Sequence, residues 1–245
     1  MKLYQSNSQG ELIHKENLFH TLGLDLHANQ VVAFVGAGGK TTSIFQLAKE
    51  IVGLKKKVIV TTTTHMYLPT KYSVLTEDKE LLLYMLNTYG MAVVGIPSGT
   101  EKMTKVSDGF YEWMRTVSDY ILVEADGSKR LPIKVPASHE PVLPLYVNPV
   151  VILCGLSCLG KSIQDHCHRS ELAMNILNCN EAHELNPMDI ATLMVEGYCK
   201  WLTVPYKIVL NQCDTMEVMA EGCQIIRYLQ GYNIAVENII LGSML

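Results

Sequence analysis

Short apolar runs rich in β-branched residues alternate with amphipathic segments along most of the chain. Strands are predicted at residues 31–35, 57–62, 91–95, 120–125, 150–154 and 206–212, with a last edge strand at 233–242. Segments with helical spacing lie between them, at residues 41–52, 78–89, 107–117, 168–179, 187–198 and 215–230. This alternation predicts an α/β protein with a mostly parallel sheet and helices on both faces. In such sheets ligands bind at the carboxyl ends of the strands, where the motifs described below fall.

The length and composition of the chain favour one large domain. Its 245 residues are 48% hydrophobic, which is enough for a full core. Residues 1–30 are interpreted as a helical lead-in, because Leu12, Leu18, Phe19 and Leu22 can line one face of a short helix. Residues 126–200 are interpreted as a loop and helical insert within a single domain of residues 1–245.

Charge and cysteine content argue against several classes of protein. A net charge of −4 and a pI near 6.1 provide no broad basic field, which disfavours nucleic-acid binding. No apolar run approaches the roughly 18 residues that would suggest a membrane span. The seven cysteines are scattered and odd in number, and no apolar leader precedes them. We therefore expect a cytoplasmic protein with free, mostly buried thiols.

The segment GAGGKTT lies between a predicted strand and a predicted helix. Backbone N–H groups in such a turn can bind phosphate, with the helix N-terminus behind them. The residues expected to bind are Gly36, Ala37, Gly38, Gly39, Lys40, Thr41 and Thr42. Lys40, at the surface of the loop, would reach the β- and γ-phosphates of ATP or GTP, Thr41 would bind Mg²⁺, and Thr42 would contact the α-phosphate. The alternative is a glycine turn that only caps a helix.

The loop departs from the standard pattern G-x-x-x-x-G-K-[ST], because Phe34 stands where the first glycine would be. GAGGKTT resembles instead the shortened GTNGKTT loop of Mur-type ligases, which bind ATP. In that pattern the first glycine is Gly36, and Phe34 belongs to the strand. The sequence therefore predicts a P-loop NTPase-like fold with a Mur- or SIMIBI-like phosphate loop.

Two carboxylates follow one another at the end of the predicted strand YILVEA, namely Glu124 and Asp126. A strand of this kind normally supplies the acid that holds Mg²⁺, so either residue could do so together with Thr41. The alternative is an Asp-Gly turn without a metal role. Both carboxylates are candidate catalytic residues, as is Lys40.

Polar residues also follow the neighbouring strand and the acidic strand. Thr63 and Thr64 could hold a metal-bound water or a γ-phosphate, or could simply extend the strand. His65 is a catalytic or substrate-binding candidate at the mouth of the site, against the commoner structural role of a lone histidine. Lys129 and Arg130 could neutralise transition-state charge or bind an anionic substrate, or could form a solvated surface pair.

The segment NQCD resembles the N-K-x-D element with which GTPases recognise guanine. Asn211 and Asp214 would contact the base, although Gln212 replaces the lysine. The alternative is a helix cap in which Asp214 begins the helix at 215–230.

Cysteines and histidines cluster between residues 154 and 168. A soft-metal site is conceivable there, but the spacing matches no closed zinc pattern, so buried free thiols are the better interpretation. Arg169 begins the next helix and is a catalytic candidate near the phosphates.

Taken together, GAGGKTT, TTTTH, VEADGSKRLPIKVPASHEPVLP, the HRSE step and NQCD resemble the selenium-dependent hydroxylase accessory proteins of the YqeC type. The motifs follow that family's order over about residues 31–214, and Gln212 departs from the family's usual lysine. The resemblance implies a cytoplasmic P-loop nucleotide-binding protein. It also implies a role in maturing selenium-dependent molybdenum hydroxylases, with such an enzyme or its cofactor precursor as partner.

Three functions fit these motifs. The first is an accessory NTPase that uses Mg²⁺ and ATP or GTP to deliver a cofactor component. The second is an ATP-dependent ligase or kinase acting on a small anionic substrate, which Lys129, Arg130 and Lys134 would suit. The third is a nucleotide-sensing scaffold without turnover.

Overall fold

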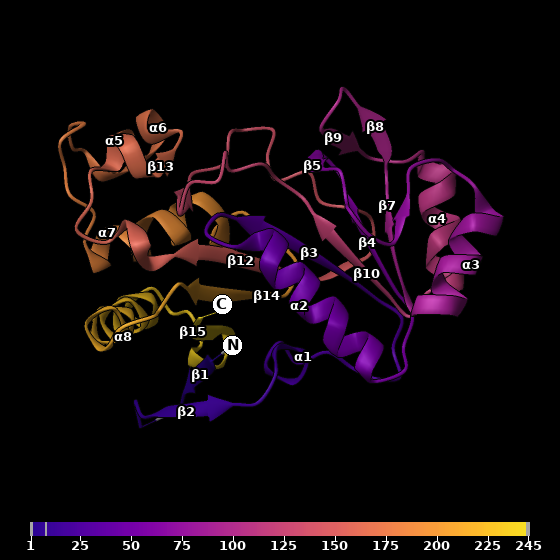
Figure 1. Cartoon of the computed structure of the whole chain (residues 1–245). Coiled ribbons are helices and arrows are strands. Elements are labelled where there is room, and N and C mark those ends of the chain that lie inside the picture. The colour runs from indigo at the N-terminus through magenta and orange to yellow at the C-terminus, as the bar shows by residue number, and fades with distance from the viewer. Residues whose placement is uncertain (1, 8, 244–245) are drawn as a thin grey trace.

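A computed structural model describes residues 2–7 and 9–243 and contains one large twisted sheet at its centre (Figure 1). The strand order is β2-β1-β15-β14-β12-β3-β10-β4-β7-β6. The strands are β1 (Lys2–Ser6), β2 (Leu12–Lys15), β3 (Gln30–Gly36), β4 (Val58–Thr62), β6 (Ser73–Val74), β7 (Met91–Val94), β10 (Tyr120–Glu124), β12 (Val147–Gly155), β14 (Tyr206–Asn211) and β15 (Ile239–Ser243). All neighbours pair in parallel except β1 with β15 and β1 with β2.

Helices cover both faces of this sheet. They are α1 (Leu18–Thr21), α2 (Lys40–Gly53), α3 (Lys79–Tyr89), α4 (Asp108–Val117), α5 (Ile163–His166), α6 (Ser170–Leu177), α7 (Pro187–Met194) and α8 (Met216–Gly231), with a π-helical turn at Val195–Cys199 and 3₁₀ turns at Leu156–Cys158 and Val236–Asn238. Successive strand residues point to opposite faces, so Val32 packs with α1 and α2, whereas Ala33 faces the core beneath α3, α4, α7 and α8. The prediction of an α/β fold with a mostly parallel sheet is confirmed.

The prediction of a helical lead-in over residues 1–30 is wrong. The described residues of this range begin with the hairpin β1–β2, and among them only Leu18–Thr21 is α-helical. Strand β1 pairs antiparallel with β15, and Leu3 is fully buried in the core with Phe19. As a result β15, which we expected at the edge, lies inside the sheet between β14 and β1. The apparent helical spacing that began at Leu12 ran across the end of β2 and the start of α1.

The segment predicted as a loop and helical insert, 126–200, contributes a central strand as well. Strand β12 lies between β3 and β14, and the loop before it packs at the carboxyl ends of the strands, where the N–H of Val142 donates to the carbonyl of Ala125. Two short strands from this segment, β11 (Ile133–Lys134) and β13 (Cys167–His168), pair in parallel and join the loop to the helices.

A second, three-stranded sheet was not predicted. It consists of β5 (His65–Tyr67), β9 (Lys102–Thr104) and β8 (Ile96–Ser98), in antiparallel order β5-β9-β8. This small sheet projects beyond the ends of β4 and β7 (Figure 1). Strands of three residues are too short to show a hydrophobic period, which is why the sequence did not indicate them. Among the described residues, no helix is long and apolar enough to span a membrane.

Candidate functional site

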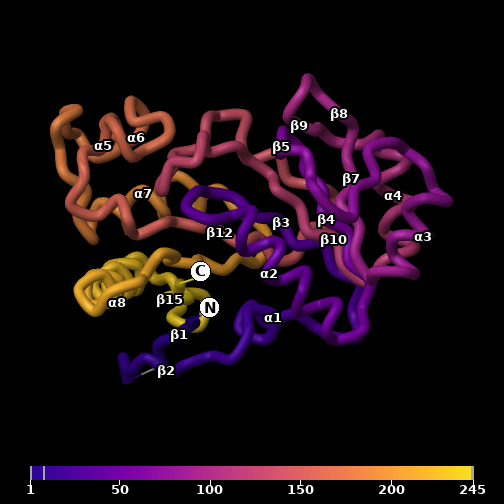
Figure 2. The backbone as a smooth tube through the Cα atoms, viewed as in Figure 1, coloured from indigo at the N-terminus to yellow at the C-terminus, as the bar shows by residue number. Residues whose placement is uncertain are grey.

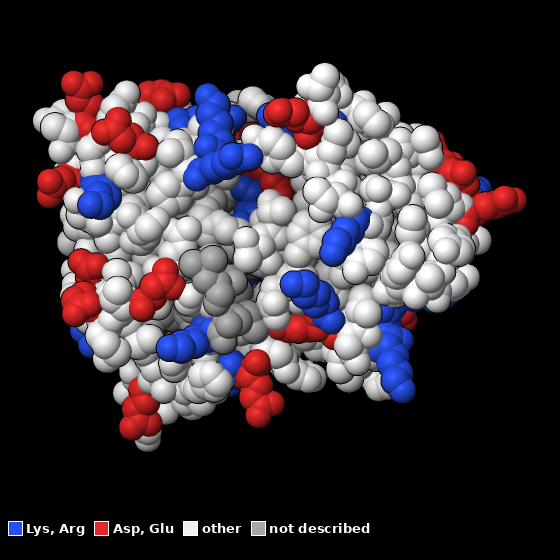
Figure 3. Space-filling model, viewed as in Figure 1, with Lys and Arg blue, Asp and Glu red and all other residues white. Residues whose placement is uncertain are grey.

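The carboxyl ends of β3, β10 and β4 lie side by side and open into a cavity. Glu124, the last residue of β10, is in register with Phe34 on one side and Thr62 on the other. The cavity has a volume of about 650 Å³. Three segments line it: residues 38–42 of the phosphate loop and α2, residues 64–67 (Thr64 and β5), and the loop 127–131. The other lining residues are Lys102, Glu124, Glu140, His168 and Gln212. Basic side chains gather around this hollow on the molecular surface (Figure 3).

The phosphate loop needs glycine because it packs closely on its neighbours. Gly36 has φ 88° and a Cβ there would lie 2.2 Å from the carbonyl oxygen of Leu153. Gly38 has φ 79° and a Cβ there would lie 2.2 Å from the backbone nitrogen of Gly155. Both the left-handed backbone and the contact with the end of β12 therefore exclude larger residues.

The N-terminus of α2 presents free backbone donors to the cavity. The N–H of Gly36 donates to Asp126 and that of Ala37 to the carbonyl of Leu153, so both lie beneath the loop. By contrast, the N–H groups of residues 38–42 have no protein acceptor within the described part of the chain. Donors of this kind at a helix N-terminus form an anion-binding site.

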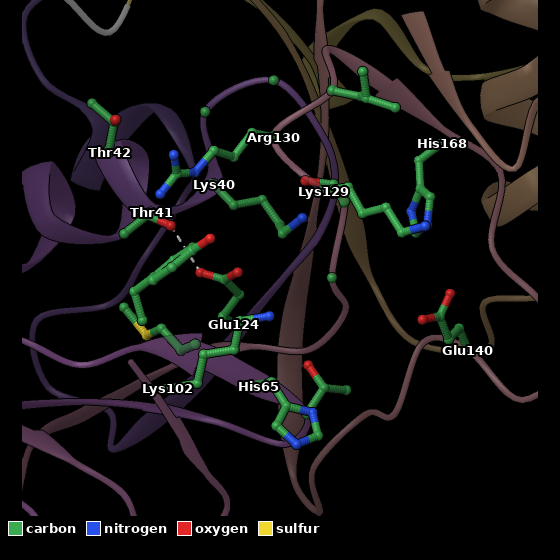
Figure 4. Close-up of a pocket in the computed structure, with 18 of the residues that line it drawn as sticks. Lys40, Thr41, Thr42, His65, Lys102, Glu124, Lys129, Arg130, Glu140 and His168 are labelled. Carbon is green, nitrogen blue, oxygen red and sulfur yellow. Dashed lines mark hydrogen bonds between the residues drawn. The ribbon is translucent and has the colours of Figure 1, made fainter. Parts of the chain in front are cut away.

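Lys40 is not at the surface of the loop, as the sequence analysis expected. Its side chain is only 3% exposed, its Nζ lies 3.0 Å from Oδ1 of Asp126, and it also donates to the carbonyl oxygen of Gly36. It still lines the cavity (Figure 4). A phosphate would have to replace Asp126 as the partner of this ammonium group.

Asp126 lies beneath the phosphate loop and not in the cavity lining. It is fully buried, and its Oδ2 accepts hydrogen bonds of 3.0 Å from both the N–H of Gly36 and the hydroxyl of Tyr198. Lys134 lies 3.2 Å from the same oxygen. These contacts bind Asp126 to protein groups, so the structure gives this carboxylate a bracing position in place of the expected metal position.

Glu124 and Thr41 are the oxygen groups that face the cavity together. The Thr41 hydroxyl donates to Oε2 of Glu124 at 3.0 Å (Figure 4). Burial raises the pKa of Glu124, while the nearby Lys40 and the Thr41 hydrogen bond act in the opposite direction. Oxygen ligands of this type suit Mg²⁺, which normally completes its shell with phosphate oxygens and water. No cluster of three His, Cys, Asp or Glu residues suited to a metal occurs among the described residues.

The predicted base-recognition segment is divided by the structure. Asn211 is buried, and its Nδ2 donates to the carbonyl of Gly38 at 2.7 Å, so it braces the phosphate loop. Gln212 lines the cavity with φ 64°, and its Oε1 accepts a hydrogen bond from Ser157 at 2.7 Å. Asp214 is exposed and does not line the cavity. It does not cap α8 either, because Thr215 is the N-cap.

Arg169 also lies behind the cavity. Its guanidinium donates to Oε2 of Glu140 at 2.6 Å, and Lys134 lies 2.7 Å from the same oxygen. Burial alone would raise the pKa of Glu140, but the hydrogen bonds from Arg169 and Lys134 bring it down to about 2. Arg169 thus holds a lining carboxylate instead of reaching the cavity itself.

The two histidines of the site differ in environment. His65 is exposed and lines the cavity, as the sequence predicted for the mouth of the site. His168 lines it too, and burial together with the charges of Arg169 and Lys134 lowers its pKa. A neutral imidazole at His168 follows, suited to accept or share a proton but not to add positive charge.

The hydroxyls of the threonines at and just after the end of β4 mainly donate to backbone carbonyls of neighbouring segments. Thr62 donates to the carbonyl of Glu124 at 2.8 Å, and Thr63 donates to that of Val142 at 2.6 Å. Thr64 alone of residues 61–64 lines the cavity. Most of the threonines at 61–64 therefore have a structural role rather than a ligand-binding one.

Cys154, Cys158 and Cys167 are buried free thiols, as expected. The hydrogen bond with Cys158, followed by burial, raises the pKa of Cys154, and burial raises that of Cys167 to about 12. Such thiols are unreactive at neutral pH.

Sequence reasoning missed several residues of the site. Tyr67 and Lys102 line the cavity from the small sheet, and Tyr198 reaches Asp126 from the π-helical turn. The one available signal was the aromatic residue two positions after His65, since alternate residues of a strand share a face.

The chain is similar to known proteins in sequence and in structure. The model of a family described as "YqeC protein" matches residues 32–171. The chain is 29% identical over 238 residues to "Uncharacterized protein YqeC" of Escherichia coli strain K12, covering 91% of this chain and 92% of that one. Two crystal structures of FtsY from Mycoplasma mycoides give TM-scores of 0.42 and 0.38 at 14% and 13% identity, over 88% and 84% of this chain. The chain spans only 62% and 59% of those two chains.

Proposed function

The chain belongs to the YqeC protein family, and we propose that its cavity binds a nucleoside triphosphate with Mg²⁺ and hydrolyses it. One observation carries this proposal. The N–H groups of residues 38–42, which have no acceptor among the described residues, surround the N-terminus of a 14-residue helix, and Lys40, Thr41 and Glu124 face the same cavity. This set supplies donors for phosphate and oxygens for a hard cation in adjoining positions.

Each residue has a specific part in the proposed reaction. The N–H groups of 38–42 hold the phosphate chain, and Lys40 exchanges Asp126 for a phosphate oxygen. Thr41 and Glu124 hold Mg²⁺, directly or through water, and the ion neutralises charge on the phosphates. His65 lines the remaining space where a water molecule would attack. Arg169 positions Glu140 and does not act on the nucleotide.

We also propose a setting for this activity. The likeness of the motifs to the accessory family supports a role in maturing selenium-dependent molybdenum hydroxylases. The partner would be such an enzyme or its cofactor precursor. All seven cysteines are free thiols, which supports a reducing compartment such as the cytoplasm.

The test is calorimetric titration of ATP and of GTP, each with Mg²⁺, into the full chain. Lys40→Ala is expected to weaken binding roughly 100-fold, because it removes a charge-assisted contact with phosphate. Lys40→Met retains most of the aliphatic stem and serves if the alanine variant is unstable. Lys56→Ala is the matched control, because Lys56 also pairs with an aspartate, Asp119 at 3.3 Å, but away from the cavity.

The outcomes separate the hypotheses. Preference for GTP would support base contact by the 211–214 segment, with Asp214 moving toward the cavity. Preference for ATP would leave bracing of the phosphate loop by Asn211 as the role of that segment. Absence of binding to both nucleotides in the wild type, or equal binding by the Lys40 variants, would refute the phosphate-loop assignment.

A further inference from the structure

One wall of the cavity carries cations that the proposed nucleotide site does not use. Lys102 from β9 and Arg130 from the turn 128–131 both lie against the ring of Tyr67 from β5. The Arg130 guanidinium is 4.6 Å from the ring centroid and the Lys102 Nζ is 5.6 Å from it. Lys129 also lines the cavity, and its side chain extends toward His168 (Figure 4). The ring therefore holds two positive charges in place without neutralising either.

These cations have no acidic partner within the described part of the chain. The ion pairs near the cavity involve Lys40, Lys134 and Arg169, and none involves Lys102, Lys129 or Arg130. The two carboxylates that line the cavity are already engaged, Glu124 by Thr41 and Glu140 by Lys134 and Arg169. The wall thus carries uncompensated positive charge facing the open cavity, which is the electrostatic condition for binding an anion.

The turn that carries Lys129 and Arg130 has an unfavourable backbone. Both residues are left-handed, with φ 51° and 64°, and the turn is closed by a 3.0 Å hydrogen bond from the N–H of Leu131 to the carbonyl of Ser128. Two left-handed central positions normally take glycine or asparagine. Long basic residues here are costly for the fold, which fits a requirement for their charges at this point.

The position of the wall is distinct from the phosphate loop. In the sheet order β14-β12-β3-β10-β4, Asn211 and Gln212 follow β14, whereas the wall stands beyond β10 and β4. A nucleotide with its base near Gln212 and its phosphates on the loop would point its terminal phosphate toward this wall.

We propose that Lys102 and Arg130, both held against Tyr67, together with Lys129, bind a second small ligand that carries two or more phosphate or carboxylate groups, beside the terminal phosphate. The placement beside the nucleotide rests on the proposed function, but the anion contacts do not. Nucleic acid does not fit this surface, because the cations line a cavity and the chain's net charge is −4.

The experiment titrates inorganic pyrophosphate into the full chain, saturated with a non-hydrolysable triphosphate analogue and excess Mg²⁺. A double variant that carries both Lys102→Gln and Arg130→Gln is compared with a matched control. The control is a second double variant that carries Lys79→Gln and Arg115→Gln. Those control residues also lie over aromatic rings, Trp113 at 5.0 Å and Tyr146 at 3.7 Å, but do not line the cavity. We expect pyrophosphate affinity to fall at least about tenfold in the first variant only, with affinity for the analogue changed less than about twofold in both.

A parallel titration with tricarballylate distinguishes a carboxylate ligand from a phosphate ligand, and the same variant pattern with either probe supports the proposal. If the cavity variant loses affinity for the analogue itself, the cations belong to the nucleotide site and the proposal is overturned. If the analogue binds but neither probe does, the second site is also overturned, while the proposed function stands.

Failure of the analogue to bind would count against the proposed function alone. In that case both probes are titrated into nucleotide-free Lys40→Ala protein with and without the Lys102→Gln and Arg130→Gln changes. Dependence of binding on those two cations would still support the anion site, and its absence would overturn it.

Discussion

The two walls of the cavity use charge in opposite ways. Around the phosphate loop, Lys40 and Asp126 are buried and paired, and Asp126 also contacts Gly36, Tyr198 and Lys134. On the wall formed by β5, β9 and the turn 128–131, the cations have no acidic partner among the residues that the structure describes. The first arrangement fixes a backbone geometry, whereas the second leaves charge available for a ligand. Substitutions on the first wall should therefore change stability and binding together, and those on the second should change binding with little effect on stability.

The largest effect is expected from Asp126→Ala. This change leaves the buried Lys134 and Lys40 without their shared carboxylate, so the free energy of unfolding should fall by about 3–5 kcal/mol. Urea denaturation of the variant measures this directly. Lys102→Gln, from the other wall, is the control and should change stability by less than about 0.5 kcal/mol. A similarly small loss in the free energy of unfolding for both variants would contradict the proposed difference between the two walls.

Glu124→Gln should separate metal binding from folding. The amide keeps the size and the hydrogen bond from Thr41, so stability should change little, but Mg²⁺ should bind at least about tenfold more weakly in the presence of nucleotide. Titration of nucleotide affinity against Mg²⁺ concentration gives the result. An unchanged Mg²⁺ dependence would show that Glu124 is not the metal residue.

Glu140, which shares Lys134 with Asp126, should make stability depend on acid pH. Its pKa is about 2 in the fold against an ordinary 4.5, so the folded state favours the carboxylate. This contribution is fully present above pH 4.5 and is lost as the pH falls from 4.5 toward 2. We expect wild type to exceed Glu140→Gln in stability at pH 7, with the difference shrinking over that interval. A difference that is constant from pH 7 to pH 3 would contradict the ion pairs with Lys134 and Arg169.

The smallest effect concerns Lys129. Lys129→Gly relieves a left-handed backbone at φ 51° and should raise the free energy of unfolding by roughly 0.5 kcal/mol, because strain relief slightly exceeds the entropy cost of glycine. Thermal denaturation compares it with Lys71→Gly, an exposed lysine whose φ is not positive, which should lose stability. Loss of stability at both positions would mean that the turn is not strained.

Much of the fold was predictable because its strands are apolar runs bounded by turn residues. Strands β3, β4, β7, β10, β12 and β14 fall within the segments predicted for them or extend them by a few residues. The hairpin β1–β2 and the small sheet were not predictable, because their strands are short and are stabilised by distant partners: β1 depends on β15, and β5 depends on β9.

The site was predictable in composition but not in arrangement. The sequence placed Lys40, Thr41, Glu124 and His65 together, and all four line the cavity. It could not choose between Glu124 and Asp126, because β10 ends at Glu124 and the chain then bends, which turns Asp126 beneath the loop. Asp126 is buried because Tyr198 and Lys134 contact it. Those contacts arise from the tertiary structure and leave no local pattern in the sequence.

The pairing of β1 with β15 has a consequence for how the chain reaches this fold. Lys2 is in register with Ser243 and Leu3 with Gly242, so the two ends of the chain meet in one sheet (Figures 1 and 2). Contacts of such long sequence separation slow folding, because a large loop must close before they form. During synthesis, which proceeds from the N-terminus, we expect β1 and β2 to stay unpaired with the sheet until β15 has left the ribosome. Removing β15 would leave the hairpin with no sheet to join.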